Sequence, residues 1–338
     1  MVRFGLFINK QYPAGESARA RFVEHLEQVR LARDLGFDSI VLGQHFLSAP
    51  FQEPQSAPLL ARFAAESGSM RLGLSILLGA LLPPIEVAEL GATLDLITDG
   101  RFICGLGLGY RAVEYEAFGV PMEQRVQRFE ENVTLIKRLW TEERVTYQGP
   151  HCRLDDVGLT LRPVQKPHPP IWLAANADAA VRRAARLGDT WAINPHANLP
   201  TIKRQLGLYK AELTAQQKGF PEDLPMRREL FVAPRLQQAW SEVRPYLDTK
   251  YDAYRAWGQQ TVLPSDDHWA EDFTELARDR FIIGDPGAVR EELQRYLEEM
   301  PEVNHFIFRV QYPGMPQELI LRAMRLLAEE VRPHLRSQ

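Results

Sequence analysis

The 338 residues contain only two cysteines, Cys104 and Cys152, and long apolar runs are equally scarce. A disulfide framework is therefore not expected, and Cys104 stands inside an apolar segment, which favours a reducing compartment. The longest apolar run, residues 72–82, is about half as long as a membrane span requires. The apolar start of the chain, residues 1–10, is too short for a signal peptide. We therefore expect a cytoplasmic protein without membrane contact.

An excess of charge of one sign is also missing, because the net charge of −4 arises from acids and bases mixed along the chain. Without a basic patch, no nucleic-acid partner is expected. No metal-ligand spacing such as H-E-x-x-H is present, and neither G-x-S-x-G nor G-x-x-x-x-G-K-[ST] occurs. A metal site, a nucleophile-elbow hydrolase and a P-loop enzyme are therefore not supported.

The sequence does contain a regular alternation of strand-like and helix-like segments with short connections. The strand-like segments are continuously apolar, which is typical of parallel strands buried on both faces. They cover residues 4–8, 39–42, 72–78, 171–175, 190–193, 229–233 and 304–310, together with one that begins at Phe102. Eight strands interleaved with helices predict a (β/α)8 TIM barrel of the α/β class, with a doubly wound open sheet as the alternative.

Two stretches interrupt this rhythm, and we interpret both as insertions in a single domain that spans residues 1–338. Residues 141–170, after the fourth helix, alternate in polarity and end in several prolines, which indicates a β-rich excursion. Residues 236–280, after the seventh strand, are expected to be irregular and partly helical. In either fold a ligand lies at the carboxyl ends of the strands, so the residues there are the candidate site.

The fourth strand is the most unusual, because Gly105, Gly107 and Gly109 alternate with leucines. Side chains point to opposite faces at every second residue, so one face of this strand carries no side chains. Such a face predicts a bed for a flat ligand, and the alternative is a tight strand exit packed under a neighbouring loop. The dinucleotide motif G-x-G-x-x-G is not met, because Tyr110 stands where the third glycine is required.

Two other strand ends carry candidate chemistry. Small residues at Ala175, Asn176 and Ala177 lead directly into a helix, whose free N–H groups could hold a phosphate. Asp178 complicates this, because its carboxylate would repel an anion unless it caps an ordinary helix and faces away. His45 follows the second strand, where it is either a hydrogen-bonded structural histidine or a catalytic group.

Short motifs occur in a fixed order along nearly the whole chain. They are Phe37-Asp38-Ser39, Gln44-His45-Phe46, Leu94-Asp95, Gly100-Arg101-Phe102, Gly105-Leu106-Gly107-Leu108-Gly109-Tyr110, Glu114, Phe118-Gly119, Pro169-Pro170-Ile171-Trp172, Ala175-Asn176, Ala184-Ala185-Arg186, Asp189-Thr190-Trp191 and Ile283-Gly284-Asp285-Pro286. In this order they resemble the bacterial luciferase-like flavin-dependent monooxygenases and their deazaflavin-dependent relatives.

The resemblance implies a TIM barrel that forms a homodimer through its second and third helices. It implies a flavin whose phosphate lies at the helix start, and a non-proline cis peptide at Ser75-Ile76 in the third strand. The ring would lie against that strand and beside the glycines of the fourth. The implied catalytic residue is His45, and the implied cofactor-binding residues are Ser75, Ile76, Gly107, Gly109, Tyr110, Ala175, Asn176 and Ala177.

The activity implied by the resemblance is that of a monooxygenase that receives reduced FMN from a separate flavin reductase. It would react with O2 through a peroxyflavin to oxidise a small-molecule substrate. One alternative is hydride transfer with an 8-hydroxy-5-deazaflavin, and another is a non-catalytic flavin-binding barrel. The last is supported by Gln44, which stands where luciferase has its key histidine. Luciferase's arginine near the phosphate matches Leu108, so the phosphate would rely on backbone amides, with Arg111 as a candidate counter-charge.

Overall fold

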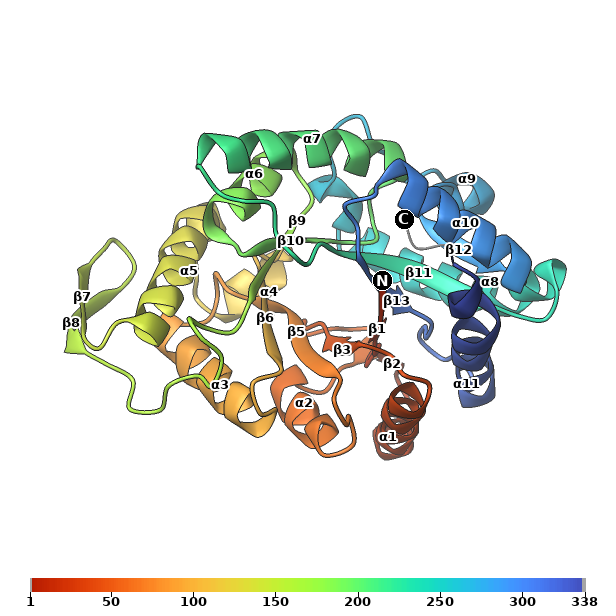
Figure 1. Ribbon diagram of the computed structural model, residues 1–338, viewed down its shortest axis with the longest axis horizontal. Coiled ribbons are helices and arrows are strands. Elements are labelled where there is room, and N and C mark those ends of the chain that lie inside the picture. Colours follow the sequence, from red (N-terminus) through yellow and green to blue (C-terminus); the bar gives the residue numbers. More distant parts are fainter. Residues whose placement is uncertain (1, 336–338) are drawn as a thin grey trace.

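The computed structural model describes residues 2–335 and has a closed barrel of eight parallel strands at its centre (Figure 1). The pairing runs around the barrel from β10 to β11, and these two strands meet where Ile193 is paired with Met226. The barrel strands are β1 (Arg3–Phe7), β3 (Ser39–Leu42), β5 (Arg71–Leu78), β6 (Phe102–Gly107), β9 (Ile171–Ala175), β10 (Thr190–Ile193), β11 (Pro225–Val232) and β13 (His305–Arg309). The predicted TIM barrel is confirmed, and the open sheet is excluded.

Helices surround the barrel in chain order (Figure 1). They are α1 (Ala18–Asp34), α2 (Ser56–Ala64), α3 (Pro84–Ile97), α4 (Ala112–Ala117), α5 (Arg125–Thr141), α6 (Asp178–Leu187), α7 (Leu199–Ala215), α8 (Leu236–Ala256), α9 (Phe273–Ala277), α10 (Pro286–Glu299) and α11 (Gln317–Leu326). Local sequence fixes many of their ends. The side chain of Ser17 caps α1, and Gly36, with a φ of +72°, follows its last turn. Asp285 caps α10, and Pro286 occupies its first position.

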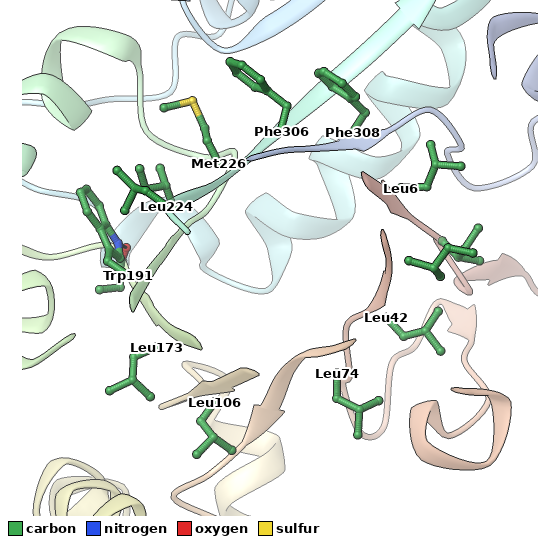
Figure 2. Close-up of a cluster of buried hydrophobic side chains, with 14 of the residues drawn as sticks. Leu6, Leu42, Leu74, Leu106, Leu173, Trp191, Leu224, Met226, Phe306 and Phe308 are labelled. Carbon is green, nitrogen blue, oxygen red and sulfur yellow. Dashed lines mark hydrogen bonds between the residues drawn. The ribbon is translucent and has the colours of Figure 1, made fainter. Parts of the chain in front are cut away.

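The barrel strands are apolar on both faces because each face packs against a separate cluster. Outward-facing side chains form the cluster between strands and helices, and Figure 2 shows ten of them pointing away from the centre of the barrel: Leu6, Leu42, Leu74, Leu106, Leu173, Trp191, Leu224, Met226, Phe306 and Phe308. A second buried cluster is built from Phe7, Val41, Ile103, Trp172, Ala192 and Ile307. This smaller cluster fills the barrel interior below the carboxyl ends of the strands, as expected for a packed TIM barrel.

The two insertions differ from each other. Within residues 141–170, β7 (Val145–Gln148) and β8 (Arg153–Val157) form an antiparallel hairpin that projects at the left of Figure 1, as the polarity pattern predicted. Within residues 236–280, the expectation of partly helical structure is confirmed, but the segment is less irregular than expected because α8 is a helix of 21 residues. Pro245 inside α8 conceals the helical pattern in the sequence. No helix within residues 2–335 combines the length and the apolar character that crossing a bilayer requires.

Besides β7 and β8, three further short strands within residues 2–335 lie outside the eight that were predicted. The strands β2 (Tyr12–Pro13) and β4 (Phe51–Gln52) pair above the barrel, and β12 (Phe281–Gly284) pairs with the second half of β11. In addition, β11 begins at Pro225, four residues before the predicted start of that strand. Polar residues at the beginning of β11 include Arg227 and Arg228, which a search for continuous apolar runs misses.

Candidate active site

A cavity of about 490 Å³ lies at the carboxyl ends of the strands. Each of the nine residues that the sequence predicted for the site lines it: His45, Ser75, Ile76, Gly107, Gly109, Tyr110, Ala175, Asn176 and Ala177. Strand ends that are far apart in the sequence are therefore brought to one place. The chemical roles of these nine residues stay predictions.

His45 lies in the loop after β3 and forms a hydrogen-bonded pair with a carboxylate. Its Nδ1 lies 3.1 Å from Oε1 of Glu114, which comes from α4. A carboxylate only accepts hydrogen bonds, so Nδ1 donates, and in the neutral ring Nε2 carries the lone pair. No described residue bonds to Nε2, and the side chain is 16% exposed where it lines the cavity. The geometry therefore gives His45 a fixed tautomer and one basic nitrogen available to a ligand.

Glu114 is held in place by the backbone and by one further cation. Its Oε1 accepts from the N–H of Phe46 at 2.9 Å, and Arg111 lies 3.5 Å away. Arg111 also donates to the carbonyl oxygens of Phe46 and Leu47, and it packs 4.2 Å above the ring of Trp257. Arg111 does not line the cavity. The expectation that it serves a phosphate was wrong, because its donors are used to shape the loop that carries His45.

The glycines of β6 make room for the neighbouring strand, and Gly107 in addition lines the cavity, so the predicted bed for a flat ligand is only partly open. A Cβ on Gly105 would lie 2.4 Å from the carbonyl oxygen of Leu74, and a Cβ on Gly107 would lie 2.2 Å from Cδ1 of Ile76. The space is filled by β5, whose register with β6 shifts between Leu74 and Leu77. The peptide bond Ser75-Ile76 is cis, as the resemblance implied. The glycines thus admit the bulged part of β5, and Ile76 forms the cavity surface there.

The start of α6 fits the predicted anion site. No side chain caps the helix at Ala177, and Asp178 turns away from it. The two oxygens of Asp178 accept from Arg204 at 2.6 Å and from Gln205 at 3.0 Å. Its carboxylate is therefore already paired and does not occupy the helix amides. Asn176 adds a buried Oδ1 atom without a partner, which suits a hydroxyl donor of a bound ligand.

Several buried charged residues at the cavity were not found from the sequence. Lys10 and Glu53 form an ion pair at 2.6 Å, and the other oxygen of Glu53 accepts from Gln11. Burial opposes the charge of Glu53, but Lys10 and His45 nevertheless hold the pKa of its carboxyl below the ordinary range. Oε1 of Glu53 also accepts from the backbone N–H of His45 at 3.2 Å. Glu53 therefore provides a second carboxylate, besides Glu114, that fixes the backbone of the histidine loop.

The remaining wall holds neutral polar groups and two arginines, of which Arg309 is buried and Arg227 is half-buried. Burial raises the pKa of Tyr110 well above its ordinary value, so its phenol stays protonated, and the hydroxyl has no partner. Burial, together with Lys250 and other cations, lowers the pKa of His196 well below its ordinary value and keeps this ring neutral. Arg227 and Arg309 line the cavity next to Phe7. The site therefore offers one available base, one neutral donor and a strongly cationic region.

The fold and the site define the class: a TIM-barrel protein whose candidate active site lies at the carboxyl ends of the strands. Within this class, the chain belongs to the luciferase-like monooxygenase family, whose sequence profile matches residues 2–301. It is 28% identical over 328 residues to an F420-dependent glucose-6-phosphate dehydrogenase of Microbacterium testaceum, covering 91% of this chain and 92% of that protein.

Solved structures give the same result. The crystal structure of the monooxygenase RslO1 from Streptomyces bottropensis has a TM-score of 0.86 at 28% identity, covering 98% of this chain and 99% of that one. An F420-dependent secondary alcohol dehydrogenase in complex with an F420-acetone adduct has a TM-score of 0.79 at 18% identity, covering 99% of both chains. The second likeness concerns the fold alone. The family is thus established, and the two chemistries among its members leave the cofactor to be argued from the site.

Proposed function

We propose that the protein is a monooxygenase that binds reduced FMN, supplied by a separate flavin reductase, and uses O2 to oxidise a small organic substrate. The observation that carries the proposal is that one cavity holds both an uncapped helix N-terminus and a histidine with a free Nε2. The likeness to the monooxygenase RslO1 supports the same chemistry. Reduced FMN would supply the electrons that activate O2, which no protein side chain can do.

The residues of this chain would bind and orient the reactants and move a proton. The amides at the start of α6 would hold the FMN phosphate, and the unpartnered Oδ1 of Asn176 would accept from a hydroxyl of the ribityl chain. Nε2 of His45 would accept or return a proton, while Glu114 fixes the ring and stabilises its charged form. The phenol of Tyr110 would donate a hydrogen bond inside the cavity, close to the edge of the His45 ring.

The test combines anaerobic binding with turnover. FMN reduced chemically is titrated into the protein without O2, and binding is followed by quenching of tryptophan fluorescence. Labelled O2 is then admitted with a panel of aldehydes, ketones and sulfonates, and the products are examined for one incorporated oxygen atom. Reduced FMN with the same substrates but without protein is the control. Failure to bind reduced FMN would overturn the proposal, and binding without product or O2 consumption would indicate a non-catalytic flavin-binding barrel.

Hydride transfer with a deazaflavin is the second candidate, favoured by the likeness to the Microbacterium testaceum dehydrogenase. A deazaflavin of the F420 type continues beyond its phosphate into a tail that carries carboxylates. Arg204, the cation next to the start of α6, is already paired with Asp178 and Asp266. Arg204 is therefore not free to bind an acidic tail, which supports FMN. The same titration with a reduced deazaflavin distinguishes the two cofactors.

We also propose that the protein forms a homodimer through α2 and α3. Three large apolar side chains of α3 are exposed: Ile85 at 39%, Leu96 at 55% and Ile97 at 46%. Exposed apolar groups that gather on one helix mark an interaction surface. Leu96→Glu should shift the mass measured by light scattering from dimer to monomer, whereas a wild-type protein that is already monomeric would contradict this proposal.

A further inference from the structure

The wall of the cavity formed by β1, β11 and β13 brings two arginines to one aromatic ring. The guanidinium carbons of Arg227 and Arg309 each lie 4.3 Å from the ring centroid of Phe7. The two carbons are therefore separated by at most twice that distance. Arg309 is 3% exposed, and both arginines line the cavity. Long cationic side chains are seldom buried at this depth without a carboxylate partner for each.

Hydrogen-bond donors remain unused at this position. Nε of Arg227 and Nε of Arg309 are buried without a hydrogen-bond partner, and so is Nδ2 of Asn9, which lines the same cavity. Nη1 of Arg309 makes no hydrogen bond either and has only the ion-pair contact with Glu229 at 3.6 Å. Arg227 uses only Nη2, which donates to the carbonyl oxygen and the hydroxyl of Ser75 at 2.7 and 3.0 Å. Unsatisfied buried donors are rare and costly, so several of them around one cavity indicate a ligand that accepts hydrogen bonds.

The excess of positive charge around these two arginines also indicates an anionic ligand. Glu229 is the carboxylate that Arg309 shares with Lys250: it lies in close contact with Lys250 and 3.6 Å from Arg309. Three cations thus surround one carboxylate inside the protein. Burial and the proximity of Arg309 lower the pKa of Lys250 to about 7 and that of Arg227 to about 9. An anion placed here would neutralise positive charge that the chain itself leaves uncompensated.

We propose that Arg227 and Arg309 form an anion subsite, which selects organic substrates that carry a carboxylate, sulfonate or phosphate group. This proposal adds a substrate class to the proposed function, and it rests on the proposed function for the reaction itself. Oxygen atoms of the anionic group would accept from the free donors of both guanidiniums and from Asn9. The face of Phe7 next to them would contact the hydrocarbon part of the substrate. Neutral analogues would leave the buried donors unpaired and would therefore bind more weakly.

Binding is measured by calorimetry on the protein without flavin, so that the result does not depend on the proposed reaction. The probes are hexanesulfonate and hexanoate, with hexanamide and hexanol as neutral counterparts of the same length. The wild-type protein should bind the anions at least about tenfold more tightly, the size expected for a charge-assisted hydrogen bond. Arg309→Gln should remove this preference, and Arg309→Lys should keep part of it. Arg235→Gln, at an exposed arginine before α8, is the matched control and should change nothing.

Each outcome bears on the subsite separately from the proposed function. Equal affinity of the wild-type protein for anionic and neutral probes would overturn the subsite without any variant. Weaker binding of reduced FMN by Arg309→Gln, with the anion preference unchanged, would assign the arginines to the cofactor and would also overturn it. If the protein oxidises aldehydes, succinic semialdehyde should have a KM at least about tenfold below that of butanal, and Arg309→Gln should remove that difference in KM.

Discussion

The two ends of the barrel each carry a histidine that is hydrogen-bonded to a carboxylate, and the two pairs differ in what surrounds them. At the amino end, His305 uses both ring nitrogens: Nδ1 lies 3.0 Å from Asp223 and Nε2 lies 2.8 Å from the hydroxyl of Ser39. At the carboxyl end, His45 uses only Nδ1, toward Glu114. The side chain of His305 is fully buried, whereas that of His45 is 16% exposed toward the cavity.

A chain of hydrogen bonds is therefore not by itself an active site. Ser39, His305 and Asp223 have the connectivity of a hydrolytic triad, yet the hydroxyl and the imidazole have no exposure. Arg3 and Arg71 complete the partners of Asp223, so the groups of this triad are all paired. The carboxyl end instead keeps unpaired polar atoms on the cavity wall. We expect the amino end to contribute stability and the carboxyl end to contribute binding and chemistry.

The largest effect is expected for His45→Ala, which tests whether the histidine at the carboxyl end takes part in the reaction. Loss of a general acid or base lowers kcat by about 10²- to 10⁴-fold, and the affinity for reduced FMN should stay the same because the phosphate is held elsewhere. Steady-state turnover and anaerobic titration of the same preparation measure the two quantities. Turnover equal to that of the wild type would show that His45 is a structural histidine.

Replacing the histidine at the amino end should have the opposite effects: a loss of stability and no change in kcat. His305→Ala should lower the free energy of unfolding by about 3 kcal/mol, because Asp223 and the Ser39 hydroxyl lose their shared partner inside the protein. The kcat of the molecules that remain folded should be unchanged. Urea denaturation measures the stability, and His45→Ala is the matched control with an expected change below about 1 kcal/mol. A loss of kcat as large as that of His45→Ala would mean that the two ends are not separable.

Local periodicity in the sequence was sufficient to predict the barrel. The strands are apolar on both faces, and the helices between them have recognisable caps such as Asp285 and Gly36. Where the pattern was interrupted, prediction was less complete: Pro245 concealed the length of α8, and β12, which directly follows the second insertion, is only four residues long. The glycines of β6 were correctly recognised as a sign of close approach: β5 approaches them closely, and Gly107 also lines the cavity.

The candidate site was predictable only where its residues stand at strand ends. His45 and Asn176 were found in this way, whereas Glu114 entered only as part of a family motif. The pairing of His45 with Glu114 joins residues 69 positions apart, and no local signal reports such a contact. Arg227 and Arg309 were missed because an arginine in a strand is normally interpreted as an exposed residue. Their position at the cavity follows from the closure of the barrel, which composition and periodicity do not describe.

The third prediction concerns the binding half of the carboxyl end. Asn176→Asp should weaken the binding of reduced FMN about tenfold, or about 1.4 kcal/mol, because it adds a charge next to the phosphate. Asn198→Asp is a matched control: Asn198 caps α7, does not line the cavity and would receive the same charge at a helix start. Anaerobic titration measures both variants. Unchanged affinity in Asn176→Asp would remove the phosphate from the start of α6.

The smallest effect is expected from acid, and it tests whether the amino end is only a structural element. Burial opposes the charge of Asp223, but the hydrogen bond from His305 and the nearby arginines outweigh it, so the pKa lies below its ordinary value of 3.8. A carboxyl whose pKa is lowered by folding stabilises the native state at higher pH, and this contribution is lost as the pH falls through the native pKa.

Asp223→Asn should therefore lower the free energy of unfolding by about 1 kcal/mol at neutral pH, and the two stability curves should converge only below pH 3.8. Urea denaturation across this range measures the difference, with Asp252→Asn, at an exposed carboxylate of α8, as the control. If kcat at neutral pH also falls in Asp223→Asn, the polar network at the amino end must influence the cavity through the barrel interior, and the separation of the two ends would fail.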